Sequence, residues 1–350
     1  MRILILGGTG AMGVHLVDLL SKTQDKVFVT SRSERDSYEN ITYIQGNANQ
    51  DEFIAKLMQK KWDAIIDFMV YSTESFKNRV ELLLKATSQY IFISSARVYA
   101  ETNPVITESS PKLLHVSKDE EYLSTDEYAL TKARQEDILK ISVEKNYTII
   151  RPYITYSERR LQLGVLEKED WLYRASRGRT IVFSEDMIDK RTTLTYGLDV
   201  SFAIFKIIGK QEALGNEFHV TNNQSVTWRY VLNVYKKVIE NHTNKKTKIL
   251  LQNKESFFKH HDAKYQALYD RFYNRCFDNS KISKLVDTRE FIEVEKGLQN
   301  CLQEFFKNPH YIKINWRKEA VKDRATGEFA SLLEIKKLKD IARYLKYRFF

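Results

Sequence analysis

The chain has 350 residues, of which 43% are hydrophobic and 29% charged, a balance that is typical of folded domains and excludes a disordered chain. Its two cysteines, Cys276 and Cys301, are too few for a disulfide framework. The adjacent His260 and His261 lack carboxylates at ligand spacing, so no metal site is predicted. No apolar run approaches the ~18 residues of a membrane span, and the apolar start MRILIL reaches glycine too early for a signal peptide, so we expect a cytoplasmic protein without a membrane span.

Apolar runs alternate with helical patterns over the first 152 residues. We expect strands over residues 2–6, 26–30, 41–45, 63–69, 89–95 and 147–152. Between them, the spacing of apolar residues predicts helices over residues 11–22, 52–60, 76–87 and about 126–145. Short apolar strands that alternate with helices indicate a parallel sheet with helices on both faces. The sequence therefore predicts an α/β fold with a doubly wound parallel sheet of the Rossmann type, whose first domain covers residues 1–157.

The regular alternation of strands and helices ends after Pro152. Helices are predicted over residues 166–178, 228–241 and 294–306, and short strands over residues 179–183, 216–220 and 247–251. We expect residues 158–310 to form mainly a smaller α/β domain, while the chain returns to the first domain near residues 192–222. Residues 311–350 form a predicted basic helical extension.

Positive charge is concentrated near the end of the sequence. The formal net charge is +10, and residues 301–350 hold twelve Lys and Arg against six Asp and Glu. Such a stretch can contact nucleic acid or anionic lipid, but a solvated helix face explains it more simply, because the cations are interleaved with acids. We therefore expect no nucleic-acid partner.

The stretch GGTGAMG directly follows the first predicted strand and opens the first predicted helix. Its Gly7, Gly10 and Gly13 are three residues apart, so that the backbone can approach a pyrophosphate whose charge meets the helix N-terminus. The residues of this loop that are expected to contact a dinucleotide are Gly7, Thr9, Gly10, Ala11, Met12 and Gly13. Residues 1–157 are thus predicted to be an NAD(P)-binding domain.

The end of the second predicted strand bears on the choice of cofactor. An acid there binds both ribose hydroxyls of NAD, whereas an arginine pairs with the 2′-phosphate of NADP. This sequence has Ser31 and Arg32, which favours NADP(H) and leaves NAD(H) open. Further cofactor contacts are predicted after the third and fourth strands, from Asn47, Ala48, Phe68 and Met69.

Tyr128 and Lys132 indicate the chemistry. They lie at i and i+4, on one face of a predicted helix. A tyrosine pKa near ~10 is too high for ready proton transfer at neutral pH, but a lysine one turn away favours the phenolate and lowers that pKa. A serine at the end of the fifth predicted strand, where the chain has Ser94 and Ser95, can hydrogen-bond the same substrate oxygen. We predict that Tyr128 and Lys132 act in proton transfer beside the nicotinamide ribose.

At these residues the chain resembles the extended short-chain dehydrogenase/reductase family, in particular its nucleotide-sugar epimerases, dehydratases and ketoreductases. The resemblance covers roughly residues 1–305 and is strongest in GGTGAMG, SSARVY, YALTK and RPY. It implies a Rossmann domain that holds NAD(P) and a smaller C-terminal domain that binds a nucleoside-diphosphate sugar. It also implies that Ser95 rather than Ser94 is the catalytic serine, that Tyr128 is the acid/base and that Lys132 anchors the cofactor. Formation of a homodimer is left open.

Two later segments resemble the parts of this family that hold the substrate diphosphate. KRTTLTYGLDV supplies Arg191, and DRFYNRCFDNSK supplies Arg271 or Arg275, between which spacing cannot choose. With Ser95, these arginines are the predicted substrate-binding residues. The chain also departs from the family: Ile154 stands where an asparagine is frequent, and residues 67–71 (DFMVY) replace the usual small residues after the fourth strand.

The resemblance leaves three reactions to weigh. Dehydratases of the family have an Asp-Glu pair directly after the catalytic serine or threonine, where this chain has Ala96 and Arg97, so dehydration is disfavoured. An epimerase returns the hydride that it removes and suits retained NAD⁺, whereas a reductase consumes hydride and suits NADPH. Arg32 therefore favours an NADP(H)-dependent nucleotide-sugar 4-ketoreductase in which Tyr128 protonates the forming alkoxide. An NAD-dependent nucleotide-sugar epimerase is the alternative. A non-catalytic cofactor-binding or RNA-associated protein is a second alternative, against which the intact catalytic set argues.

Overall fold

The structure, a computed structural model, describes residues 1–102 and 105–350. The chain forms two compact units, each made from three segments. The first unit comprises Met1–Ser157, Thr193–Gln224 and Cys276–Val294. The second comprises Glu158–Thr192, Ser225–Arg275 and Glu295–Phe350, so that residues 311–350 fold as part of it.

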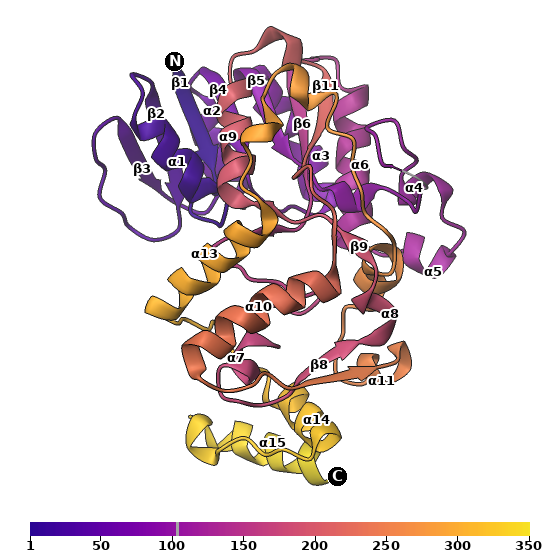
Figure 1. The fold of residues 1–350 in the computed structure, drawn as a ribbon. Coiled ribbons are helices and arrows are strands. Elements are labelled where there is room, and N and C mark those ends of the chain that lie inside the picture. The colour runs from indigo at the N-terminus through magenta and orange to yellow at the C-terminus, as the bar shows by residue number, and fades with distance from the viewer. Residues whose placement is uncertain (103–104) are drawn as a thin grey trace. The chain divides into compact units, whose positions relative to one another are not determined.

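A parallel sheet forms the centre of the first unit (Figure 1). Its strands lie in the spatial order β3-β2-β1-β4-β5-β6-β11, and every neighbouring pair is parallel. Their bounds are β1 Arg2–Leu6, β2 Lys26–Ser31, β3 Ile41–Gln45, β4 Trp62–Asp67, β5 Thr87–Ile93, β6 Tyr147–Pro152 and β11 Asn216–Val220. The chain order reverses beside β1, which is the switch point of a doubly wound sheet. The predicted Rossmann-type fold is confirmed.

Helices cover both faces of this sheet. Ile3 and Ile5 of β1 join one hydrophobic core, whereas Leu4 and Leu6 join the other, because successive side chains of a strand point to opposite faces. The first core includes α1 Gly13–Ser21 and α9 Gly197–Ile207. The second includes α2 Asp51–Met58, α3 Thr73–Lys85 and α6 Tyr128–Ile141. Burial on both faces is the reason that these strands read as continuous apolar runs.

Shorter elements complete the first unit. They are the 3₁₀ turns η1 Ala96–Val98, η2 Gln211–Ala213, η4 Ile282–Lys284 and η5 Thr288–Glu290, the helices α4 Leu113–Val116 and α5 Glu120–Leu123, and the paired strands β7 Thr155–Tyr156 and β10 Thr195–Tyr196. Of these, η1 directly follows Ser95 and lies at the carboxyl end of β5.

The second unit is a smaller α/β assembly, as the sequence predicts. Its strands form two pairs, β8 Ile181–Ser184 with β13 Ile249–Gln252 and β9 Arg191–Thr192 with β12 Val226–Thr227. Its helical elements are α7 Leu172–Ala175, α8 Glu185–Ile188, α10 Trp228–Thr243, α11 Lys254–Phe258, α12 Lys264–Gln266, η3 Ala267–Arg271, α13 Val294–Lys307, α14 Trp316–Thr326, η6 Leu332–Glu334 and α15 Leu338–Phe349. Within residues 1–102 and 105–350, none of the helices is both long and apolar enough to cross a membrane.

The helix predicted over residues 166–178 is wrong in length, because only α7 is helical there. Leu163 and Leu166 exchange backbone hydrogen bonds of 2.9 Å and form an isolated bridge. This bridge turns the chain where the apolar spacing predicts the start of a helix. Trp171, just before α7, has a φ of −123° and also lies outside helical geometry.

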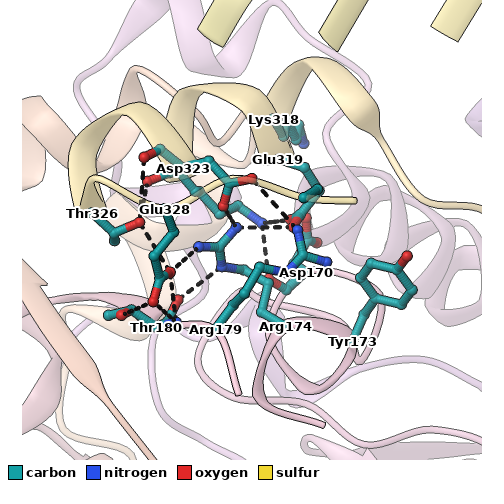
Figure 2. A network of polar contacts seen from close by, with 12 residues as sticks. Asp170, Tyr173, Arg174, Arg179, Thr180, Lys318, Glu319, Asp323, Thr326 and Glu328 are labelled. Atoms are coloured by element: carbon teal, nitrogen blue, oxygen red, sulfur yellow. Dashed lines mark hydrogen bonds and ion pairs between the residues drawn. The ribbon is translucent and has the colours of Figure 1, made fainter. Parts of the chain in front are cut away.

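The C-terminal helices α14 and α15 are attached to the rest of the second unit by a small core and a buried polar network. The core contains Tyr173, Trp316 and Tyr344. In the network, the buried Arg174 of α7 donates hydrogen bonds to Glu319 and Asp323 of α14 over 3.0 and 2.7 Å (Figure 2). We call these contacts the Arg174 network.

Candidate cofactor and active site

A cleft opens at the carboxyl ends of β1 to β4, beside the switch point of the sheet. Its volume is about 470 Å³, within the range of small-molecule sites. Its lining residues are Gly7, Thr9, Gly10, Thr30, Ser31, Arg32, Gly46, Asn47, Ala48, Asn49, Phe68, Met69 and Val70. Doubly wound sheets bind ligands at this position, because the loops that follow neighbouring strands diverge there.

The three glycines of the first loop have different structural tasks. Gly7 has a φ of +72°, which favours glycine, and its N–H donates to the Thr30 hydroxyl over 3.0 Å. A Cβ on Gly13 would lie 2.6 Å from the backbone of Gly8, so the start of α1 approaches the loop too closely for any side chain. A Cβ on Gly10 would meet no atom within 4 Å. Gly10 thus leaves space in the cleft for a ligand.

The cleft gathers most of the residues that the sequence predicts to hold the dinucleotide. Those that line it are Gly7, Thr9, Gly10, Ser31, Arg32, Asn47, Ala48, Phe68 and Met69. Ala11, Met12, Gly13, Tyr128 and Lys132 are not among its lining residues. Sequence reasoning missed Thr30, Gly46, Asn49 and Val70, although each is adjacent to a predicted residue.

Arg32 lies exposed on the rim of this cleft. In the part of the chain that the structure describes, it makes no hydrogen bond or ion pair. The neighbouring Ser31 hydroxyl accepts a hydrogen bond of 3.2 Å from Arg35 Nε, and the Arg35 guanidinium lies 5.8 Å from the ring centre of Tyr43. Two guanidinium groups therefore lie near the end of β2, and that of Arg32 remains available to an anion.

The three predicted catalytic residues lie at the end of β5 and the start of α6. Lys132 is buried, and its Nζ donates to the carbonyl of Ile93, the last residue of β5, over 2.7 Å. The same Nζ lies 6.0 Å from the ring centre of Tyr128, which is 36% exposed. Ser95 caps η1, and its hydroxyl accepts a hydrogen bond of 3.2 Å from the Arg97 N–H. Lys132 thus lies between the ring of Tyr128 and the end of β5, which precedes Ser95 by two residues.

Arg97 is a further residue of this site that the sequence did not identify as functional. Its guanidinium forms an ion pair with Glu127 and lies 5.4 Å from the ring centre of Tyr128. Glu127 also caps α6, because its carboxylate accepts the Ala129 N–H over 2.7 Å. The pair thus fixes the helix end on which Tyr128 lies to the turn after Ser95. The available signal in the sequence was a pair of opposite charges close to the predicted catalytic residues, Arg97 two residues after Ser95 and Glu127 directly before Tyr128.

Buried carboxylates surround Lys132. Burial lowers the pKa of Lys132 to about 8, although the charges of Asp67 and Glu136 raise it. Burial raises the pKa of Asp67. The Asp67 carboxylate accepts hydrogen bonds from the Tyr90 and Tyr71 hydroxyls over 2.7 and 3.1 Å. Below a pH of about 8, Lys132 is therefore a buried cation that can stabilise a phenolate on Tyr128.

Glu136 is held as an anion by its own partners. Burial would raise its pKa, but Arg151 and Lys112 lower the pKa of Glu136 to about 2. The Arg151 guanidinium donates to both carboxylate oxygens over 2.8 and 2.6 Å, and the Ser94 hydroxyl donates over 2.5 Å. The Ser94 hydroxyl is therefore engaged with Glu136, whereas the Ser95 hydroxyl caps the η1 turn.

Ile154 keeps an unusual backbone conformation. Its φ is +35°, in the left-handed region that β-branched residues rarely adopt and that asparagine tolerates well. Its carbonyl accepts the Thr195 N–H over 3.2 Å, which ties this turn to β10. Ile154 thus has a backbone conformation that suits asparagine, the residue that the resembled family often has at this position, although its side chain lacks the amide.

The predicted substrate arginines lie in the second unit. Arg191 is exposed, and its carbonyl accepts the Arg275 N–H over 3.0 Å, so these two residues are neighbours. Arg275 and Arg271 are both buried and both form ion pairs with the buried Asp270. Arg271 Nε also donates to the Gly164 carbonyl over 3.1 Å. The structure thus brings all three predicted arginines to the segment that includes Asp270.

No metal cluster is found among the residues described: no group of three or more His, Cys, Asp or Glu side chains there is arranged to hold an ion. His260 and His261 are buried, and burial lowers their pKa values to about 3 and about 4. Both rings therefore stay neutral at physiological pH.

Comparison with known proteins gives a family model and several similar structures. Residues 3–220 match the model described as the NAD dependent epimerase/dehydratase family, while no curated protein matches the sequence. Epimerase Mth375 from Methanothermobacter thermautotrophicus has a TM-score of 0.68 and 15% identity, over 88% of this chain and 92% of that chain. The Bordetella bronchiseptica enzyme WbmH in complex with NAD⁺ has a TM-score of 0.67 and 14% identity, over 88% and 99% of the two chains. UDP-glucuronic acid 4-epimerase from Bacillus cereus, in complex with UDP-glucuronic acid and NAD, has a TM-score of 0.63 and 15% identity, over 88% and 99%. At these identities the three structures establish the fold alone.

Proposed function

This chain belongs to the NAD-dependent epimerase/dehydratase family, and from that premise we propose that it is a nucleotide-sugar epimerase that retains its dinucleotide through each turnover. The observation that carries the proposal is the set of Ser95, Tyr128 and Lys132 at the ends of β5 and α6, with the lysine buried beneath the tyrosine ring. Dehydration would need a further acid and base after Ser95. Ala96 cannot transfer a proton, and Arg97 is engaged with Glu127.

The chain's own residues would transfer one proton, stabilise the phenolate that forms and bind the pyrophosphate of the dinucleotide. Tyr128 removes the proton of the reacting hydroxyl and later returns it, while Lys132 stabilises the phenolate and Ser95 binds the same oxygen. When bound, the nicotinamide dinucleotide supplies the hydride acceptor and donor. Gly7, Thr9 and Gly10 would hold its pyrophosphate, consistent with the open space at Gly10.

A nucleoside-diphosphate sugar is the proposed substrate. Arg191 would pair with its diphosphate, together with Arg275 or Arg271, because a diphosphate needs cations at adjacent positions. The exposed Arg191 next to Arg275 supports this assignment. Two of the similar structures are named as epimerases, and one of them as an enzyme that acts on UDP-glucuronic acid, so UDP-hexoses and UDP-hexuronic acids are the first substrates to test.

The test of this function separates epimerisation from reduction. The purified protein is incubated with UDP-sugars without added cofactor, and products are identified by NMR while absorbance at the nicotinamide band is followed. An epimerase converts substrate into its epimer with no net change in the reduced cofactor. Stoichiometric consumption of added NADPH with a keto-sugar nucleotide, and no epimerisation, would refute the proposal and favour a reductase.

A ketoreductase dependent on NADPH is the second candidate, and one observation favours it. Arg32 lies on the cleft rim without a partner among the described residues, beside Ser31 and Arg35, where it could pair with a 2′-phosphate. Cofactor preference and reaction type are only loosely linked. The position of Arg32 therefore favours NADP(H) more strongly than it favours reduction.

Replacing Arg32 by aspartate is expected to reverse the cofactor preference. An arginine–phosphate contact contributes about 1.5–3 kcal/mol, so wild-type protein should bind NADPH about ten- to a hundredfold more tightly than NADH. In Arg32→Asp the carboxylate repels the phosphate and accepts hydrogen bonds from a free ribose. The measurement is Kd for both reduced cofactors by fluorescence at fixed ionic strength. Arg289→Ala, which removes an exposed arginine of the same unit, is the control. Equal affinities in wild type and Arg32→Asp would show that Arg32 does not contact the cofactor.

Replacing Arg191 by alanine is expected to raise KM for the sugar nucleotide at least about tenfold, because a charge-assisted phosphate contact is lost. Its kcat should change less, since the arginine is proposed to bind the diphosphate equally in the ground and transition states. Arg191→Lys should recover part of the affinity, and Arg229→Ala is the matched control because Arg229 is exposed and paired with Asp189. An unchanged KM, together with unchanged inhibition by UDP, would mean that Arg191 is structural.

A further inference from the structure

The C-terminal part of the second unit contains a second open cleft, of about 840 Å³, which is larger than the dinucleotide cleft. It lies between the segment of residues 309–316 and the segment of residues 333–340. The side chains that matter here are Tyr173, Tyr311, Trp316, Lys313, Lys336 and Lys337. No step of the proposed reaction uses this cleft.

The acids of this cleft are already paired, whereas its lysines are not. Glu334 forms ion pairs of 3.1 Å with both Arg177 and Arg179. Asp340 is paired with Arg343 over 3.3 Å. Exposed lysines at positions 313, 336 and 337 form no ion pair within the described residues. The cleft therefore presents an uncompensated positive charge to solvent.

Aliphatic side chains project from the same rim. Ile312 is 80% exposed and Leu333 97% exposed, and both line the cleft. Leu338, directly after Lys337, is 84% exposed. Single exposed aliphatic residues are common on protein surfaces, but these stand beside unpaired lysines on one concave surface. Apolar and cationic groups thus alternate over the two segments that form the rim.

The aromatic floor argues against a nucleotide or a stacked base as the occupant. The Arg177 guanidinium covers the Tyr173 ring at 3.7 Å, and Tyr311 and Trp316 meet that ring edge-on at centroid distances of 5.2 and 6.1 Å. These rings therefore pack against one another and against the Arg177 guanidinium. A base needs a free ring face on which to stack.

The placement of the aliphatic residues argues against a docked helix. A groove that accepts an amphipathic helix has its apolar side chains on the floor, where the helix buries them. Here the aromatic side chains of the floor, such as Trp316, are already buried, whereas Ile312 and Leu333 at the rim are 80% and 97% exposed. Projecting aliphatic side chains with interspersed lysines match the interfacial region of an anionic bilayer, where apolar groups enter the acyl boundary and ammonium groups meet phosphates.

We propose that Ile312, Lys313, Leu333, Lys336 and Lys337 form a surface that binds peripherally to membranes containing anionic phospholipids. Lysines of the cleft contact headgroup phosphates, and Ile312 and Leu333 enter the interface. The proposal is independent of the reaction that the first unit catalyses.

Vesicle co-sedimentation of the full chain tests this surface. We expect binding to vesicles of equal parts phosphatidylcholine and phosphatidylserine, and none to vesicles of phosphatidylcholine alone. Each lysine near an anionic surface contributes about fivefold in binding, so Lys336→Ala/Lys337→Ala should lower the partition coefficient by about 25-fold. Ile312→Ser/Leu333→Ser should also lower it, and should do so at raised ionic strength as well. All four side chains are exposed, so folding should be unaffected.

Matched variants of the first unit control for net charge and exposed apolar area. Lys56→Ala/Lys60→Ala removes two exposed lysines, and Ile141→Ser/Val143→Ser removes two aliphatic side chains that are 82% and 90% exposed. Neither pair should change vesicle binding. Equal losses in test and control variants, or equal binding to both lipid compositions, would overturn the proposal. Displacement of the protein from vesicles by inorganic phosphate at constant ionic strength would indicate a small-anion site instead. Retention on RNA without vesicle binding would indicate a nucleic-acid surface. Either result refutes the membrane assignment.

Discussion

Replacing Tyr128 by phenylalanine is expected to lower kcat by at least ~10²-fold while Kd for the dinucleotide stays nearly unchanged. The reason is that in the proposed mechanism the hydroxyl transfers the proton, whereas the ring makes the packing contacts with Arg97 and Lys132. Phenylalanine keeps that ring, so the end of α6 should remain in place. The measurement is steady-state turnover of the substrate found in the epimerase test, together with cofactor binding by fluorescence.

Two further measurements make this result specific to proton transfer. Tyr38→Phe removes the hydroxyl of another exposed tyrosine of the first unit and should leave kcat unchanged. The rate of wild-type protein should fall as pH drops through the pKa of the essential base, whereas the residual rate of Tyr128→Phe should not follow that profile. A well-folded Tyr128→Phe protein with near-normal kcat would remove Tyr128 from the mechanism and the proposed function with it.

The sheet of the first unit could be predicted almost residue by residue, because strands buried on both faces appear as uninterrupted apolar runs. The predicted strands over residues 2–6, 41–45 and 147–152 coincide with β1, β3 and β6. The fourth prediction runs two residues too far, through Phe68 and Met69. The apolar run continues there, but the Met69 N–H donates to the Asp67 carboxylate over 2.9 Å and the chain turns into the cleft.

The lining of the cleft could be predicted for a topological reason. Loops after neighbouring parallel strands meet at one edge of the sheet, so residues that directly follow β1 to β4 in sequence lie together in space. Thr30 and Gly46 were missed although they follow from the same rule. At Gly10 the missing side chain matters for the space that it leaves in the cleft rather than for the backbone angle φ, and composition alone does not distinguish these two roles.

Pairings of charges across long stretches of sequence could not be predicted. Arg97 and Glu127 are 30 residues apart, and Arg174 and Asp323 are 149 residues apart. Helical or strand periodicity carries no information about which of many charged residues meet over such separations. The predicted extension therefore looked like a solvated basic face, whereas Glu319, Lys322 and Asp323 of α14 are buried.

Replacing the buried Arg174 by methionine is expected to destabilise the second unit by about 3–5 kcal/mol, because removing one partner of a buried ion pair leaves the others uncompensated. Burial alone would lower the pKa of Arg174, but Glu319 and Asp323 raise it above its ordinary value, so the guanidinium is charged throughout. Its loss leaves two buried carboxylates (Figure 2). Arg179 and Lys322 contact these acids too, so the loss is partly offset.

Urea denaturation followed by tryptophan fluorescence measures this loss, since Trp171, Trp228 and Trp316 lie in the second unit and only Trp62 in the first. Arg177→Met is the matched control: Arg177 is partly exposed and its ion pair is with Glu334, so the change should cost no more than about 1 kcal/mol.

A change of pH then separates the charge effect from the effect of a changed side-chain volume. An unpaired buried carboxyl has a raised pKa in the folded state, so folding takes up a proton and stability rises as pH falls. Acidification should therefore restore part of the stability of Arg174→Met relative to wild type. A defect of packing alone would be equally large at every pH. Wild-type stability in Arg174→Met would show that the Arg174 network does not hold α14 in place.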